Sequence, residues 1–170
     1  MGILDFLSGT KRPGEGTPVK PAAELKAALL ALNRETAPWH VREATPGEGC
    51  DLIVEWKIVD ANWYGIFDKQ KLESVFKIFL KFDAEHGEVR ALDKEYTVNW
   101  KAGVPTLGEV SAFRGQKTEV SFGIGYGFIE KGKFGEVYNY RFSTTEMKTP
   151  VKQAVTAASW TYKGVVFGKL

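Results

Sequence analysis

The sequence is poor in the residues from which most metal and redox sites are built. Its 170 residues include one cysteine, Cys50, and two histidines. A single cysteine excludes an internal disulfide, a Cys-x-x-Cys redox pair and a cysteine-rich zinc cluster. Because a reducing compartment suits such a chain, we expect a cytoplasmic location.

The sequence also lacks an excess of charge and a long hydrophobic run. Lys and Arg number 23 against 21 Asp and Glu, a net charge of +2 at pH 7, whereas proteins that bind the phosphate backbone carry a basic excess. We therefore expect no nucleic-acid partner. No stretch approaches the roughly 18 apolar residues of a membrane-spanning helix. The apolar cluster within residues 1–7 is too short to hold a membrane alone, so membrane contact there is the less favoured interpretation.

Turn-forming residues dominate the segment before the first predicted helix. Ser, Gly, Thr and Pro recur through residues 8–20 without apolar periodicity, which is typical of a flexible segment. Pro21 suits the first turn of a helix, and apolar residues then recur every three or four positions over residues 21–34. We therefore predict a flexible lead-in over residues 1–20 and a single α+β domain over residues 21–170.

After this helix the apolar residues recur every second position, which is typical of strands. In residues 89–101 the phase of this alternation changes, which predicts a bulge or bend near residues 92–94. A last helix is predicted over residues 150–162, with Pro150 at its first position. The other predicted segments are strands 52–58, 76–82, 118–130 and 135–142, a turn at 83–87 and a loop at 102–116.

These elements predict an α+β fold. We expect a twisted or barrel-like antiparallel sheet of six to nine strands, with the N-terminal helix and the C-terminal helix packed on it.

One predicted strand has a face without side chains. In residues 120–128 the glycines Gly123, Gly125 and Gly127 alternate with large apolar residues. Interior glycines weaken a strand, so they indicate that another group approaches this face closely. That group is a stripe of small residues on the C-terminal helix, or a flat ligand, while simple barrel curvature is the remaining explanation.

No catalytic or metal-binding motif stands out. His40 has no recognisable nucleophile near it, and we interpret it as a packing residue. The segment 83–88 offers three carboxylates and His86 as metal donors, but it lacks the spacing of a calcium loop, so we interpret it as a solvated turn. We therefore predict no catalytic residue, no metal and no cofactor.

Aromatic residues make up 13% of the sequence, which suits a large-residue core or an apolar pocket. Our leading hypothesis is a non-catalytic binding module that takes a hydrophobic or amphiphilic small molecule between the sheet and a helix. One alternative is a homo-oligomeric scaffold or protein-interaction domain. Another is a small enzyme that uses His40 or carboxylates in or beside the predicted strands, which are Glu55, Asp60, Glu95, Glu119 and Glu136. The candidate ligand-binding residues are Gly123, Gly125, Gly127, Trp56, Trp100, Tyr138, Tyr140 and Arg141.

Three segments carry a resemblance to known proteins: Met-Gly-Ile-Leu-Asp-Phe-Leu at 1–7, Phe-Arg-Gly-Gln-Lys-Thr-Glu-Val-Ser-Phe at 113–122 and Val-Tyr-Asn-Tyr-Arg-Phe-Ser at 137–143. They resemble a family of short, uncharacterised bacterial proteins of unknown function. The resemblance spans nearly the whole chain and implies a bacterial, cytosolic protein. Because no activity is known for that family, it implies no functional residues.

Overall fold

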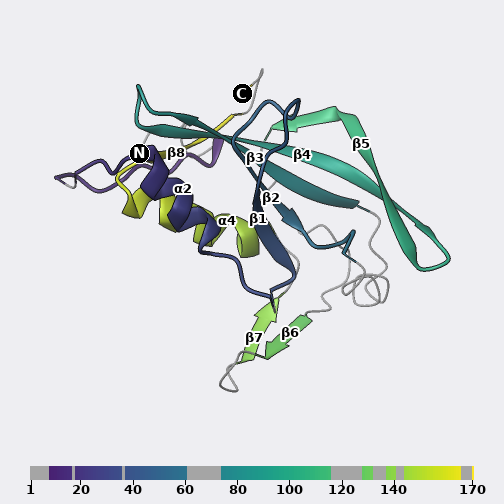
Figure 1. Cartoon of the computed structure of the whole chain (residues 1–170). Helices are drawn as coiled ribbons and strands as arrows, with labels where there is room; N and C mark the ends of the chain where they lie inside the picture. Colours follow the sequence, from purple (N-terminus) through teal and green to yellow (C-terminus); the bar gives the residue numbers. More distant parts are fainter. Residues whose placement is uncertain are drawn as a thin grey trace.

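An α+β arrangement, with helix α2 before the strands and helix α4 between β7 and β8, is confirmed by a computed structural model (Figure 1). The structure describes residues 8–16, 18–35, 37–60, 74–115, 128–131, 137–140, 144–165 and 170. Within these residues no helix is long and apolar enough to cross a membrane. The elements are α2 (Ala22–Leu30), β1 (Trp39–Glu43), β2 (Leu52–Trp56), β3 (Ser74–Asp83), β4 (Glu88–Lys101), β5 (Val104–Gly115), β6 (Phe128–Lys131), β7 (Val137–Tyr140), α4 (Thr144–Ala157) and β8 (Thr161–Gly164).

The main sheet is a curled, half-barrel meander of β1, β2, β3, β4 and β5, in which neighbouring strands are antiparallel. The sixth strand, β8, runs parallel to the first part of β4 and pairs with it over Glu88–Ala91. Strand β5 pairs with the remainder of β4, from Asp93 to Lys101. The long strand β4 therefore pairs with two different strands, β8 and β5, along the same edge. A separate two-stranded sheet contains β6 and β7.

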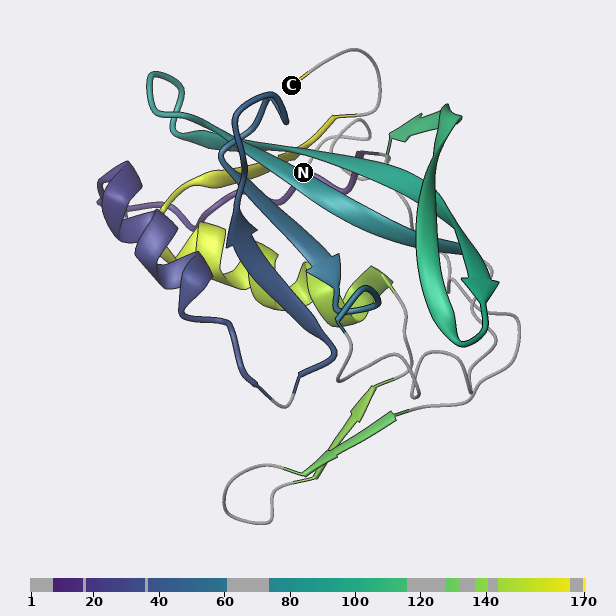
Figure 2. The same ribbon diagram turned by 45° about the vertical axis from the view of Figure 1, so that its right-hand side comes forward.

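Helices α2 and α4 lie together against one face of the main sheet (Figure 2). Apolar side chains from both helices and from alternate strand positions form the core between them. Leu25 and Leu29 of α2 are fully buried there, as are Val151 and Val155 of α4. We call this side of the sheet the helix face and the opposite side the outer face.

In residues 89–101 the alternation of apolar residues changes phase. The reason is that β4 buries one face in its first part and the opposite face in its second part. Val89, Ala91 and Asp93 point to the helix face and are fully buried. Beyond them Val98, on the outer face, is buried, while Thr97 on the helix face is exposed. The pairing of β4 with β3 continues without interruption, and the register shift lies between β4 and β5. An irregularity therefore lies next to the predicted position, between Lys94 and Tyr96, in the pairing with β5 and not in the pairing with β3.

The loop predicted over residues 102–116 is also wrong, because most of this segment forms strand β5. Gly103, Pro105 and Gly108 favoured a loop. However, β5 stands at the end of the sheet order, and proline is tolerated on an edge strand because its missing N–H costs no ladder bond there. Pro105 lies opposite Trp100 of β4.

Helix α4 begins before its predicted start and ends before its predicted end at residue 162. It runs from Thr144 to Ala157, with Pro150 inside it. An interior proline costs roughly 3 kcal/mol, and the burial of a continuous apolar face outweighs this cost. Residues four apart lie on one face of a helix. The fully buried residues on this face are Met147, Val151 and Val155.

The C-terminus of α4 is set by Ser159, which adopts a left-handed conformation with φ of 62°. The N–H of Trp160 donates to the carbonyl of Val155, and the N–H of Ser159 donates to the carbonyl of Thr156. This pair of bonds is the Schellman motif, which usually has glycine where Ser159 stands. The chain then turns into β8, so Tyr162 is in a strand rather than in the helix.

The segment before α2 contacts the domain at several points. The backbone of Lys11 exchanges two hydrogen bonds with Tyr162, and the Thr10 hydroxyl accepts one from the N–H of Gly164. The carbonyl of Lys20 accepts a hydrogen bond from the Trp160 indole. The boundary between residues 1–20 and residues 21–170 stays a prediction.

Two sequence-based expectations lie largely outside the described residues. The predicted strands 118–130 and 135–142 are described only at residues 128–131 and 137–140, which pair in antiparallel register with Phe128 opposite Tyr140. The glycine-bearing face of residues 121–127 lies outside the described residues.

The Schellman motif predicts how position 159 tolerates substitution. Ser159→Gly should leave the free energy of unfolding within about 0.5 kcal/mol of the wild type, because glycine adopts positive φ readily. Ser159→Val should lower it by about 1–2 kcal/mol, because a branched Cβ is strained in this conformation. Urea unfolding of the two variants measures the difference. Equal stabilities would contradict the role given to Ser159.

Candidate functional site

The predicted ligand-binding residues are only partly described. Gly123, Gly125, Gly127 and Arg141 lie outside the described residues. For Tyr138 and Tyr140 the structure places the backbone, on strand β7 of the two-stranded sheet. Of the eight candidates, the side chains of Trp56 and Trp100 alone belong to the described part of the chain.

The structure does not bring these two tryptophans together. Trp56 lies on the helix face opposite Trp39 of β1 and is only 2% exposed. Trp100 lies near the end of β4 opposite Pro105, and strand alternation places its side chain on the outer face. Trp56 is therefore a core residue, whereas half-buried Trp100 lies on the face that the helices leave uncovered.

Charged side chains from three adjacent strands converge on Glu55 at the outer face. The sheet register places His40 of β1 opposite Glu55 of β2, and Glu55 opposite Lys77 of β3. Arg42 follows His40 by two positions, so it points to the same face. We call His40, Arg42, Glu55 and Lys77 the Glu55 cluster.

Each partner donates a hydrogen bond to the carboxylate of Glu55. His40 Nε2 lies 3.1 Å and Arg42 Nε 2.7 Å from Oε1, while Lys77 Nζ lies 2.9 Å from Oε2. Because a carboxylate only accepts, the proton on His40 must be at Nε2. The side chain of Glu55 is 10% exposed, so these donors replace the water that it loses.

The cluster keeps Glu55 ionised. Burial alone would raise the pKa of Glu55, but the hydrogen bonds from His40, Lys77 and Arg42 outweigh it and lower the pKa to about 2. Arg42 also binds both oxygens of Glu48 at 3.0 and 2.9 Å. This bond is the main cause that lowers the pKa of Glu48 to about 2.

These values decide which chemistry the cluster suits. A general acid or base works best with a pKa near the operating pH, and Glu55 is fully ionised at neutral pH. Burial raises the pKa of the nearby Cys50 thiol to about 11, so this thiol is protonated at neutral pH and is a poor nucleophile. The cluster therefore suits the binding of a charged ligand better than the transfer of a proton.

Next to this cluster, pairs of residues on β3 and β4 alternate between basic and apolar along the outer face. Lys77 lies directly opposite Lys94, and Lys81 lies directly opposite Arg90. Phe79 and Leu92 separate the two basic pairs. We call Lys77, Lys94, Lys81 and Arg90 the basic ladder.

Apolar residues continue beyond the Lys77–Lys94 pair. Val75 and Tyr96 form the next cross-strand pair, and Val98, Trp100 and Leu107 follow on β4 and β5. The ammonium of Lys77 lies 4.9 Å from the centre of the Tyr96 ring, and that of Lys94 lies 4.4 Å from the centre of the Phe79 ring. Basic and aromatic groups are therefore in direct contact on the outer face.

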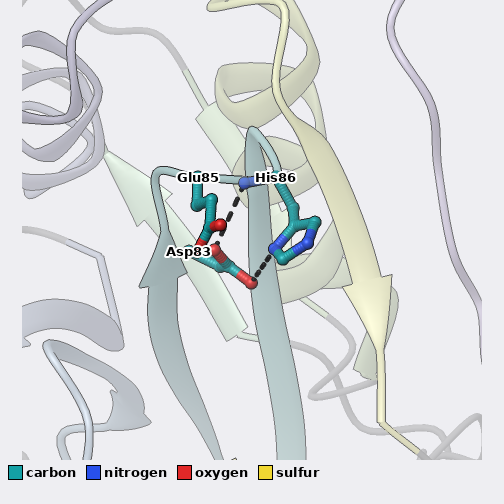
Figure 3. Close-up of side chains that lie close together, drawn as sticks. All are labelled: Asp83, Glu85 and His86. Carbon is teal, nitrogen blue, oxygen red and sulfur yellow. Dashed lines mark hydrogen bonds and ion pairs between the residues drawn. The ribbon is translucent and has the colours of Figure 1, made fainter.

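The turn between β3 and β4 gathers Asp83, Glu85 and His86, whose potential ligand atoms lie within 4.8 Å of one another (Figure 3). His86 Nδ1 lies 2.8 Å from Asp83 Oδ2, and this hydrogen bond is the main cause that lowers the pKa of Asp83. The side chains of Glu85 and His86 are exposed. The local hydrogen bonds account for this geometry, so it carries no argument for a metal.

Comparison with known proteins gives no assignment. No protein-family model matches the chain, and neither a curated protein nor a solved structure matches it.

The basic ladder was missed in the sequence, although a signal for it exists. Lys77 and Lys81 share one parity in the predicted strand 76–82, and the predicted turn at 83–87 sets the hairpin register. Counting outward from that turn pairs Lys81 with Arg90 and Lys77 with Lys94. The Glu55 cluster has no comparable signal, since the pairing of β1, β2 and β3 is not set by a short turn.

The Glu55 cluster predicts a pH-dependent contribution to stability. Because the pKa of Glu55 falls from 4.5 to about 2 on folding, its contribution is full above about pH 4.5 and is lost as the pH falls toward 2. Glu55→Gln should therefore lower the free energy of unfolding by about 2–3 kcal/mol at pH 7 and by much less near pH 2. Urea unfolding of wild type and variant across this range measures the difference.

The matched control is Glu43→Gln. Glu43 is exposed and pairs with Lys26 at the surface, so its loss should cost less than about 1 kcal/mol at either pH. A difference between wild type and Glu55→Gln that stayed constant with pH would contradict the ion-pair account.

Proposed function

We propose that this chain is a non-catalytic binding module for an anionic amphiphile, a small molecule with an acidic head group and an apolar tail. In this proposal the head group lies at Lys77 and Lys94, and the tail lies along Tyr96, Trp100 and Leu107. The observation that carries the proposal is the direct cross-strand pairing of Lys77 with Lys94 beside an aromatic surface.

Charge supports the position of the head group. Like charges directly opposite each other destabilise a sheet, and the ladder contains two such pairs, Lys77–Lys94 and Lys81–Arg90. Glu55 binds Lys77, and an anion between the two strands would reduce the repulsion between Lys77 and Lys94. On the same face the pair that follows Lys81–Arg90 is acidic, Asp83 and Glu88, and it favours a ligand at the Lys77–Lys94 end of the ladder.

Partial exposure supports the position of the tail. Tyr96, Trp100 and Leu107 are each half-buried and pack against the edge of the hydrophobic core. An apolar chain on this surface would remove more of it from water, at about 25 cal/mol for each Å² covered. The combination suits an amphiphile better than a purely polar anion.

Packing argues against the site between sheet and helix that the sequence favoured. On the helix face Leu52 and Val54 are fully buried, and Leu25 and Val155 of the facing helices are fully buried as well. A ligand there would have to displace side chains that already fill the core. On the outer face Lys94, Tyr96 and Trp100 are only half-buried, so a ligand can contact them without such displacement.

We also infer a bacterial origin and a cytoplasmic location. The inferred origin rests on the resemblance of the quoted segments to short bacterial proteins. The single cysteine, whose half-buried thiol has a raised pKa, suits a compartment without disulfide formation.

The test uses dodecyl phosphate as the probe, at concentrations below those at which it forms micelles. Native mass spectrometry should show one dodecyl phosphate per chain, and calorimetry should give its affinity. Dodecyl maltoside, which has the same tail and a neutral head, should bind more weakly. Lys94→Gln should weaken dodecyl phosphate binding by about tenfold, which corresponds to one charged hydrogen bond.

The matched control is Lys26→Gln, which removes an exposed lysine on α2, away from the outer face. This variant should bind dodecyl phosphate as the wild type does. Equal affinities for the two amphiphiles, or equal effects of the two substitutions, would refute the proposed site. A multimer without bound ligand in the same spectra would favour the homo-oligomeric scaffold.

A further inference from the structure

A row of three basic residues crosses strands β3, β4 and β8. Lys81 of β3 lies directly opposite Arg90 of β4, and Arg90 lies directly opposite Lys163 of β8. Residues paired across neighbouring strands point to the same face of a sheet. The neighbouring pair of Val89 and Tyr162 is fully buried on the helix face, so the three basic residues lie on the outer face. We call Lys81, Arg90 and Lys163 the basic row.

The basic row is accessible to a ligand and keeps an excess of positive charge. Lys81 is exposed, the side chain of Lys163 is 53% exposed, and Arg90 between them is half-buried. Two acidic residues lie on the same face beside the row. Glu88 Oε2 lies 3.8 Å from Lys163 Nζ, and the carboxylate of Asp83 accepts hydrogen bonds within its own turn. Three basic residues against these two acidic ones leave one positive charge in excess.

Lys94 connects the proposed head-group site to the basic row. Its ammonium lies 4.4 Å from the centre of the Phe79 ring, and Phe79 stands between Lys77 and Lys81 on this face of β3. Two residues separate Phe79 from Lys81, which is roughly 7 Å along a strand. The ammonium of Lys94 is therefore displaced toward the basic row, whereas that of Lys77 lies near the Tyr96 ring, on the side of the proposed tail.

We propose that the head group of the bound amphiphile is a diphosphate, whose second phosphate binds the basic row. This inference rests on the proposed function, because it extends the same site. The first phosphate lies at Lys77 and Lys94, and the second reaches over Phe79 to the basic row. The tail lies along Tyr96 and Trp100, on the other side of the first phosphate. The three parts of the ligand therefore follow the hairpin of β3 and β4 in one line.

The second phosphate reduces a repulsion that a single phosphate leaves in place. Like charges directly opposite each other destabilise a sheet, and the basic row contains two such contacts, Lys81–Arg90 and Arg90–Lys163. The planar guanidinium of Arg90 suits two phosphate oxygens at once. A diphosphate meets both groups of cations because its two phosphates share one bridging oxygen, and the long lysine side chains span the remaining distance.

The experiment compares dodecyl diphosphate with dodecyl phosphate on the full-length chain. Calorimetry measures both affinities at pH 8, below the concentrations at which either compound forms micelles. The second phosphate should tighten binding to the wild type by about tenfold, because it adds charged hydrogen bonds. Lys81→Gln and Lys163→Gln should each reduce this advantage to about threefold or less, since each removes one of the new contacts. The affinity for dodecyl phosphate should change little in either variant.

The matched control is Lys101→Gln, which removes the same charge elsewhere. Lys101 is exposed like Lys81, but strand alternation turns it to the opposite face of β4 from Arg90. This variant should keep the full advantage of dodecyl diphosphate. Wild-type binding of dodecyl phosphate without a gain from the second phosphate would overturn this inference alone, as would equal losses in Lys101→Gln and Lys81→Gln. Binding of neither compound would refute the proposed function as well.

Discussion

The structure depends on one constraint: strand β4 has to bury opposite faces at its two ends. Its first part packs Val89 and Ala91 against the helices and pairs with β8. Its second part buries Val98 on the other face and pairs with β5. Because the side chains of a strand alternate strictly, this change needs no extra residue in β4 but requires the sheet to curl. The half-barrel shape and the partly covered aromatic surface of the outer face both follow from it.

The same sheet buries a carboxylate on each face, and each one positions a neighbouring element. Asp93 on the helix face binds Lys148, which ties α4 to β4. Glu55 on the outer face binds groups from β1 and β3, which ties three strands in one register. A buried charge without its partner is far more costly than an exposed one. These contacts therefore favour one arrangement of helix and strands over others that would bury as much apolar surface.

Local patterns predicted the elements better than the contacts between them. The alternation in residues 76–82 and 89–101, with the turn at 83–87, was enough to identify the hairpin of β3 and β4. The predicted start of α4 was too late, because proline at position 150 is typical of the first turn of a helix. In the structure the turn before Pro150 is also helical and buries Met147. The alternation of apolar residues in the predicted strand 52–58 suits a strand with one buried face, yet all residues of β2 are buried. On its outer face Glu55 is enclosed by His40, Arg42 and Lys77 from the two neighbouring strands, and no local pattern contains these contacts.

The small net charge does not reveal how the lysines are distributed. The chain has a net charge of only +2, yet lysines lie close together on the outer face and again on α4. Their surroundings are similar at the two places. At each place a carboxylate binds one lysine, and a second lysine lies over an aromatic ring: Lys94 over Phe79 on the outer face and Lys152 over Tyr162 on the helix side. The two places differ in enclosure. On the outer face Lys94 lies near the half-buried side chains of Tyr96 and Trp100, which suits a reversibly bound amphiphile, whereas Lys152 is half-buried against the ring of Tyr162.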